Sequence, residues 1–160
     1  MYQRILVPVD GSMTSRRGLD AAIDMARLTG ASLRLVHVID ELVFSTGFEP
    51  GATYMKDVLP RIRSDGARVL DAARAQVAAA GVASDTVLKE CFGTRTSDVV
   101  LGAAKEWNAD LIVLGTHGRR GIGRMLLGSD AEQVMRGAHV PVLLVRSDVA
   151  VGDTHVPRTP

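Results

Sequence analysis

Short apolar runs alternate with helical patterns along nearly the whole chain. The runs have the length and composition of buried strands, and they lie at residues 4–9, 32–38, 85–91, 110–114 and 141–146. Between them, apolar residues recur at the spacing of a helix face. Such alternation predicts an α/β fold with a parallel sheet and right-handed crossovers. We expect a single doubly wound five-stranded parallel sheet, in the order 3-2-1-4-5, with helices on both faces.

Composition agrees with this architecture and limits the function. Of 160 residues, 46% are hydrophobic but only 4% aromatic, so the core must be aliphatic, as suits a covered parallel sheet. A net charge of +1 gives no sign of nucleic acid or membrane binding. The single cysteine, Cys91, excludes an internal disulfide, and no signal peptide or spanning run is visible, so we expect a cytoplasmic protein. One domain over residues 1–146 and a disordered tail over 147–160 are expected.

Glycine and proline mark the expected helix ends. Gly30 should close the first helix, and a long loop should occupy residues 39–54. A long helix should run from Val58 to Val77, with Pro60 in its first turn. Two shorter helices should begin near Thr96 and at Ser129.

A glycine-punctuated segment, residues 115–129, links the fourth strand to the last helix. Glycines let the backbone approach an anion, and a helix N-terminus offers unpaired N–H groups and partial positive charge. Arg119, Arg120 and Arg124 add donors suited to phosphate. Ser129 and Glu132 have the spacing of a capping box that would open the helix. The segment therefore predicts a phosphate site.

Two common phosphate motifs do not match. Residues 123–129 have the glycine spacing of a Walker A loop, but Ser129 stands where that motif needs lysine. The dinucleotide fingerprint needs three glycines after the first strand, where this chain has Val9-Asp10-Gly11-Ser12. A P-loop NTPase and a dinucleotide-binding domain are thus disfavoured.

A third pattern does match. Gly115-x-x-Gly118, nine residues and Gly128-Ser129 resemble the ATP-binding motif of the universal stress protein family. Residues 5–12, 33–38, 109–115 and 140–146 are similar to the strands and turn of that family, so the resemblance covers about residues 1–146. It implies an adenine nucleotide alpha hydrolase-like fold, a nucleotide ligand (ATP, or alternatively ADP or AMP) and a homodimer.

The resemblance also implies a nucleotide site beyond the carboxyl ends of the strands, where ligands bind in doubly wound sheets. Asp10 would contact the ribose or help to hold Mg²⁺, although it also suits a turn. Val38 would meet the adenine, mainly through its backbone. The implied contact residues are Pro8, Val9, Asp10, Val38, Leu114, Gly115, Thr116, Gly118, Arg119, Arg120, Gly121, Gly128, Ser129 and Asp130.

Some residues depart from the pattern or have simpler roles. Asp130 stands where family members that hold a triphosphate often have an apolar residue, and its carboxylate would repel phosphate. Ser129 would donate to phosphate or serve only as a helix cap. His117 suits an exposed loop, His37 and His139 suit structural roles, and the histidine spacing fits no zinc site.

The sequence shows no familiar hydrolase, protease or redox motif. We therefore expect an ATP-binding regulatory module with an unidentified protein partner. A slow ATPase or phosphotransferase, and a family member that binds no nucleotide, remain alternatives. A receiver domain is disfavoured because its cluster of strand-end acids is missing. The apolar edge formed by Val142-Leu-Leu-Val145 predicts pairing with a second copy of the chain.

Overall fold

The computed structural model describes residues 1–40, 54–91, 93–116 and 128–146. Most of the expected loop, the centre of the glycine segment at 117–127, and the expected tail at 147–160 lie outside these residues. In chain order the elements are β1 (Arg4–Pro8), α1 (Met13–Thr29), β2 (Ser32–Asp40), the short π-helix η2 (Tyr54–Val58), α3 (Leu59–Ala79), β3 (Ser84–Cys91), α4 (Thr96–Glu106), β4 (Leu111–Gly115), α5 (Ser129–Gly137) and β5 (Val142–Val145).

The strands form one five-stranded sheet in the order β3-β2-β1-β4-β5. Every neighbouring pair is parallel, which confirms the expected doubly wound topology. From β1 at the centre, the chain moves outward to β3, returns through α4 to β4 on the other side of β1, and ends at the edge strand β5. The carboxyl ends of all strands therefore lie along one edge of the sheet.

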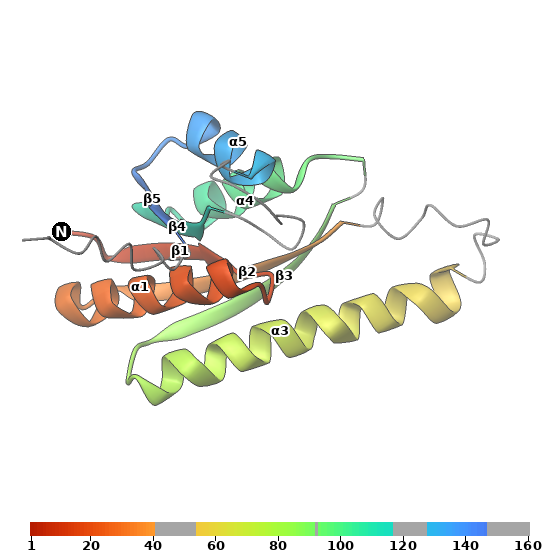
Figure 1. Cartoon of the computed structure of the whole chain (residues 1–160), viewed down its shortest axis with the longest axis horizontal. Helices are drawn as coiled ribbons and strands as arrows, with labels where there is room; N and C mark the ends of the chain where they lie inside the picture. The colour runs from red at the N-terminus through yellow and green to blue at the C-terminus, as the bar shows by residue number, and fades with distance from the viewer. Residues whose placement is uncertain (41–53, 92, 117–127, 147–160) are drawn as a thin grey trace, which may run out of the picture.

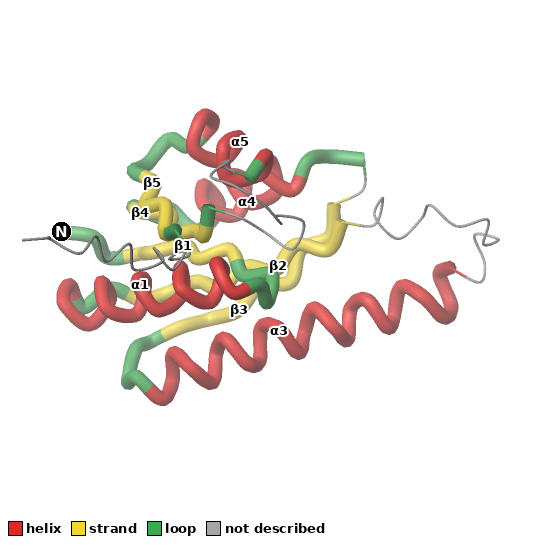
Figure 2. The backbone as a smooth tube through the Cα atoms, in the orientation of Figure 1, coloured by secondary structure: helices red, strands yellow, loops and turns green. Residues whose placement is uncertain are grey.

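Helices cover both faces of the sheet: α1 and α3 lie on one face, and α4 and α5 on the other (Figure 1; Figure 2). Side chains of β1 alternate between these faces. Ile5 and Val7 pack in the cluster that includes α1 and α3, and Leu6 packs in the cluster that includes α4 and α5. All three are fully buried. The core is aliphatic, as the composition predicts.

The ends of three elements show which residues control them. β1 ends at Pro8, one residue earlier than expected, whereas β2 continues to Asp40, two residues further than expected. The neighbouring strand explains the length of β2, because β3 pairs with every residue from Leu33 to Asp40. Gly30 ends α1 as predicted, with a φ of 73° that glycine adopts without steric cost.

Candidate functional site

The sheet parts between β1 and β4 at their carboxyl ends. Pairing with β4 covers only Ile5 and Leu6, although pairing with β2 continues to Pro8. The Arg4 carbonyl accepts from the Asp110 N–H, so Leu6 and Pro8, at alternate positions, also turn their backbone groups toward β4. Because Pro8 has no N–H, it cannot extend this ladder. The region where β1 and β4 are no longer paired, here named the opening, thus follows from a proline in the sequence.

β2 runs past the end of β1 and leaves part of its backbone edge uncovered. The Val9 N–H donates to the Val36 carbonyl at 2.8 Å. Alternate residues of a parallel strand face the same neighbour, so the N–H and C=O of Val38 face the same side as those of Val36. No backbone group of the described residues pairs with Val38 on that side. This edge offers one donor and one acceptor next to the opening.

Side chains hold the turn that follows β1. Oδ1 of Asp10 accepts from the Ser12 N–H at 2.9 Å, and Oγ of Ser15 accepts from the Asp10 N–H at 3.1 Å. Ser12 then caps α1 by accepting from the Ser15 N–H at 3.2 Å. Asp10 therefore acts as a turn residue through one carboxylate oxygen, and it is half-buried at the end of β1.

The carboxyl end of β4 lies against the N-terminal part of α1. A Cβ atom on Gly18 would come within 3.1 Å of the Gly115 nitrogen, so glycine is needed for this approach. The Leu114 side chain is buried in the cluster formed with α4 and α5. The end of β4 is thus fixed from both faces of the sheet.

Two backbone hydrogen bonds anchor the glycine segment at its ends. The Thr116 N–H donates to the Val145 carbonyl at 2.9 Å, and the Gly128 N–H donates to the Thr116 carbonyl at 2.7 Å. The N-terminus of α5 is thereby held at the carboxyl end of β4. The expected phosphate contacts between these anchors lie outside the described residues: Gly118, Arg119, Arg120 and Gly121.

The start of α5 differs from the expected capping box. Gly128, not Ser129, is the N-cap, and no side chain accepts from the first turn among the described residues. Glu132 pairs instead with Arg136 one turn later, at 3.0 Å from Nε. The capping-box prediction was wrong because the helix begins one residue earlier: the Gly128 carbonyl accepts from the Glu132 N–H, and a glycine cap has no side chain that could accept. Ser129 and Asp130 are both exposed in the first turn of the helix.

Two contacts at the site were missed from the sequence. Ser15 holds the Asp10 backbone, and its position three residues after a helix cap was the available signal. His37, assigned only a structural role, is buried and hydrogen-bonds the Val9 carbonyl. A histidine within an apolar strand was the signal there. Cys91 is buried, as expected of a small core residue.

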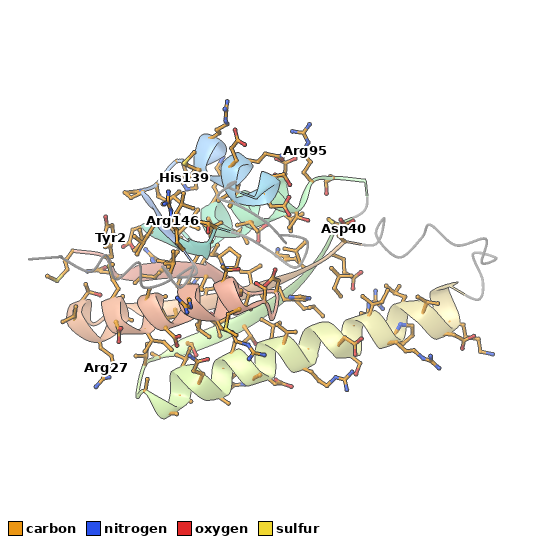
Figure 3. All side chains as sticks on the ribbon, viewed as in Figure 1. Tyr2, Arg27, Asp40, Arg95, His139 and Arg146 are labelled. Atoms are coloured by element: carbon orange, nitrogen blue, oxygen red, sulfur yellow. The ribbon has the colours of Figure 1, made fainter. Side chains whose placement is uncertain are left out.

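Charged groups do not form a metal centre in the described part of the chain. No group of three His, Cys, Asp or Glu side chains gathers there in a way that could hold a metal ion. Asp40 lies at the carboxyl end of β2 and Arg27 at the opposite end of the molecule (Figure 3). None of the described helices is both long and apolar enough to cross a bilayer.

A second groove of about 700 Å³ lies between α1 and α3 and reaches Val9 and Ser15 at the turn after β1. Leu19 and Val69 contribute to its apolar lining, and Arg16 and Arg68 are among its charged residues. Neither Val38 nor the N-terminus of α5 lines it. We therefore assign the candidate site to the strand ends, where the open edge of β2 and the anchored glycine segment occur.

Comparison with known proteins agrees with this architecture. The profile of the universal stress protein family matches residues 1–146. A universal stress protein of Bacillus subtilis is 32% identical over 151 residues, which cover 91% of this chain and 100% of the relative. A universal stress protein of Archaeoglobus fulgidus in complex with dAMP aligns with a TM-score of 0.66 and 27% identity, covering 90% of this chain and 98% of the other. A universal stress protein in complex with cAMP aligns with a TM-score of 0.61 and 28% identity, covering 92% and 98%.

Proposed function

The chain belongs to the universal stress protein family, and we propose that it is a stress-response regulator that binds an adenine nucleotide at the carboxyl ends of β1, β2 and β4. The observation that carries the proposal is the uncovered Val38 edge beside the opening between β1 and β4. The complexes of two relatives with dAMP and cAMP support an adenine nucleotide as the ligand.

The backbone of Val38 suits the hydrogen-bonding edge of adenine. Its N–H would donate to the ring nitrogen N1, and its C=O would accept from the 6-amino group. The half-buried Val38 side chain contributes to the apolar cluster on the α4 and α5 face. A mostly apolar wall with a few directed polar groups is typical of small-molecule sites. Because the contact is made by the backbone, the residue type at position 38 does not reveal it in the sequence.

The phosphates would lie against the glycine segment and the first turn of α5. Its N–H groups have no side-chain acceptor among the described residues, which leaves them available to an anion. Asp10, at the end of β1, would contact the ribose through its carboxylate. The proposed contact residues are those implied by the motif: Pro8, Val9, Asp10, Val38, Leu114, Gly115, Thr116, Gly118, Arg119, Arg120, Gly121, Gly128, Ser129 and Asp130.

Magnesium fits this site only as a companion of the nucleotide. Asp10 offers one carboxylate, already engaged with Ser12, and no cluster of metal-binding side chains surrounds it among the described residues. Mg²⁺ prefers waters, phosphates and one or two carboxylates. The ion would therefore be held mainly by the phosphates, with Asp10 as a protein ligand from the described residues, and would neutralise their charge.

The site is better suited to binding than to catalysis. In the turn after β1, the described side chains serve as turn and cap groups: Asp10 and Ser15 hold the turn, and Ser12 caps α1. Occupancy would instead change the surface presented to a protein partner. Slow hydrolysis of ATP is the second candidate function. Its support is limited to the N-terminus of α5, which is suited to binding an anion.

Calorimetry with AMP, ADP and ATP on nucleotide-stripped protein tests the proposal, together with mass spectrometry of nucleotide released from untreated protein. Gly128 has φ −59° and ψ 146°, which valine adopts readily, so Gly128→Val should fold. Its side chain would block the phosphates, and we expect an affinity loss of at least about tenfold, or 1.4 kcal/mol. Gly102→Ala is the control, since a Cβ there meets nothing within 4 Å.

Each outcome has a distinct meaning. Binding by the wild type and the Gly102→Ala protein, with a loss in Gly128→Val, supports the site. Unchanged affinity in a folded Gly128→Val protein would move the nucleotide elsewhere. The proposed function would be overturned if calorimetry detected no binding of AMP, ADP or ATP and no nucleotide were released from the untreated protein.

A further inference from the structure

A buried histidine, His37, forms a hydrogen bond with the backbone just after β1, the central strand. His37, in β2, is 5% exposed, and its Nδ1 lies 2.6 Å from the Val9 carbonyl oxygen. A carbonyl only accepts, so Nδ1 carries the proton and donates. In a continued parallel ladder, the Val38 N–H would have been the donor to this carbonyl. The side chain of His37 has taken the place of a backbone group.

The room for this imidazole comes from Gly66 of α3. A Cβ atom on Gly66 would lie 2.8 Å from Cδ2 of His37 and 2.9 Å from Cδ1 of Leu88. Gly66 is itself buried in the middle of a helix, where glycine costs about 1 kcal/mol relative to alanine. The absence of a side chain at Gly66 thus lets α3 pack directly on the ring. The backbone of α3 therefore covers one side of the imidazole ring.

We infer that His37 is a positioning residue of the nucleotide site: by occupying the Val9 carbonyl it ends the ladder between β1 and β2 and keeps the Val38 N–H available to the ligand. The inference rests on the proposed function. Without the imidazole, the carbonyl of Val9 would lose this donor, and the Val38 N–H, which comes next in the register of the ladder, would pair with it. The β2 edge would then lose the Val38 N–H as a donor to the 6-aminopurine.

Two variants separate this role from simple packing. His37→Leu keeps an apolar side chain against Leu88 but removes the donor. His37→Asn is smaller, yet its amide nitrogen occupies nearly the position of Nδ1 and restores the donor. A purely structural role would make Asn the more damaging change, because it leaves the larger cavity and buries a polar group. A positioning role makes Leu the more damaging change for the ligand.

AMP and IMP are matched probes, since they share ribose and phosphate and differ at the base edge. AMP accepts at N1 and donates from its amino group, whereas IMP has the reverse pattern. We expect the wild type and His37→Asn to prefer AMP over IMP by about tenfold or more, and His37→Leu to lose this preference through weaker AMP binding. Equal loss of AMP and IMP in both variants, or a preference retained in His37→Leu, would overturn the inference.

Amide hydrogen exchange followed by NMR in the free protein gives a readout that needs no nucleotide. The Val38 amide should exchange faster than the amides of Val36 and His37 in the wild type and His37→Asn. It should become protected in His37→Leu, where it joins the ladder. Protection of Val38 equal to its neighbours in the wild type would overturn the inference, even if His37→Leu fails to fold.

The binding measurements and the amide exchange distinguish failure of the proposed function from failure of the role of His37. If neither AMP nor ATP binds the wild type but exchange behaves as expected, the proposed function fails and the effect of His37 on the strand edge stands. If AMP binds with the expected preference but exchange at Val38 is slow in the wild type, the role of His37 fails and the proposed function stands.

Discussion

A Cβ atom on Gly115 would lie 2.6 Å from both the carbonyl carbon and the carbonyl oxygen of Thr14. Thr14 belongs to the first turn of α1, and backbone atoms there cannot move aside as the end of a flexible side chain can. The last residue of β4 therefore touches the start of α1 directly. This contact joins two walls of the candidate site, the turn after β1 and the anchor of the glycine segment.

Gly115→Ala should destabilise the protein by about 2 kcal/mol, because the added methyl group forces α1 away from β4. Gly102→Ala is the matched control. It lies within α4 with nothing within 4 Å of its Cβ position, and it should stabilise the protein by about 0.5–1 kcal/mol. Urea denaturation measures both changes in the free energy of unfolding, provided that its dependence on urea concentration is the same in all three proteins. Equal stability of Gly115→Ala and the wild type would show that this contact is not tight in solution.

The sequence predicts the frame of this fold well because its signals are local. Apolar runs locate the five strands, and glycine at position 30 ends α1 through a backbone conformation that its neighbours cannot adopt. Right-handed crossovers then leave few strand orders. The length of β2 was not predictable in this way, since its last residues depend on pairing with β3, which is distant in sequence.

The site is harder to predict because its geometry comes from tertiary contacts. The place of the strand-end residues follows from topology. A histidine within an apolar strand marks His37 as unusual, but its partner, the Val9 carbonyl, is 28 residues away and is set by the tertiary fold. At α5, Gly128 and Ser129 are both acceptable caps by residue type, and the structure uses Gly128, which has no side chain to form a capping box. The contacts of residues 117–127 stay predictions.

Asp130 should limit affinity for a triphosphate. It is exposed in the first turn of α5, where its carboxylate already interacts with the helix dipole. Asp130→Val removes this charge, so we expect ATP to bind several-fold more tightly without Mg²⁺, with a smaller change for AMP. Asp98→Val, in the first turn of α4, is the control for an acidic residue at a helix start. Equal changes for ATP and AMP would show that Asp130 does not face the terminal phosphates.

The exposed edge of β5 should pair with a second copy of the chain. The carbonyls of Pro141 and Val145 accept from β4, so Leu143 also faces β4 and the backbone groups of Val142 and Leu144 face outward. The four residues of β5 are apolar and only half-buried. An edge of this kind is a template for pairing, and a two-fold partner offering the same edge would close it.

A proline at position 144 tests this pairing more sharply than a charge does. Leu143 and Leu144 pack against the two opposite core clusters, so lysine at either would also disturb the single chain. Leu144→Pro removes an outward N–H and should yield monomers, whereas Leu144→Ala loses side-chain volume but should stay dimeric. Light scattering at micromolar concentration gives the mass. A monomeric wild type, or a dimeric Leu144→Pro protein, would contradict the proposed interface.

Acid should remove one small contribution to stability. Arg63 Nε donates to Glu90 Oε1 at 2.6 Å, and this hydrogen bond holds the pKa of Glu90 below its ordinary value of 4.5. A lowered folded-state pKa stabilises above 4.5, and the effect is lost as pH falls through the folded value. Glu90→Gln should therefore cost less than about 1 kcal/mol at pH 7 and nothing in stronger acid.

A double-variant cycle with Arg63→Gln isolates that interaction. The coupling between the two changes should be present at pH 7, weaken with added salt, and disappear below the folded pKa of Glu90. A coupling that stays constant across this pH range would show that the pair does not form in solution.

An adenine nucleotide is proposed to bind at the carboxyl ends of β1, β2 and β4. Titration of ¹⁵N-labelled protein with ATP, followed by NMR amide shifts, tests it most directly. The account predicts the largest shifts at Asp10, Val38, Thr116 and Gly128, with the Val38 amide moving in the direction of a new hydrogen bond. Shifts confined to the lining of the groove between α1 and α3, or none at saturating ATP, would contradict it.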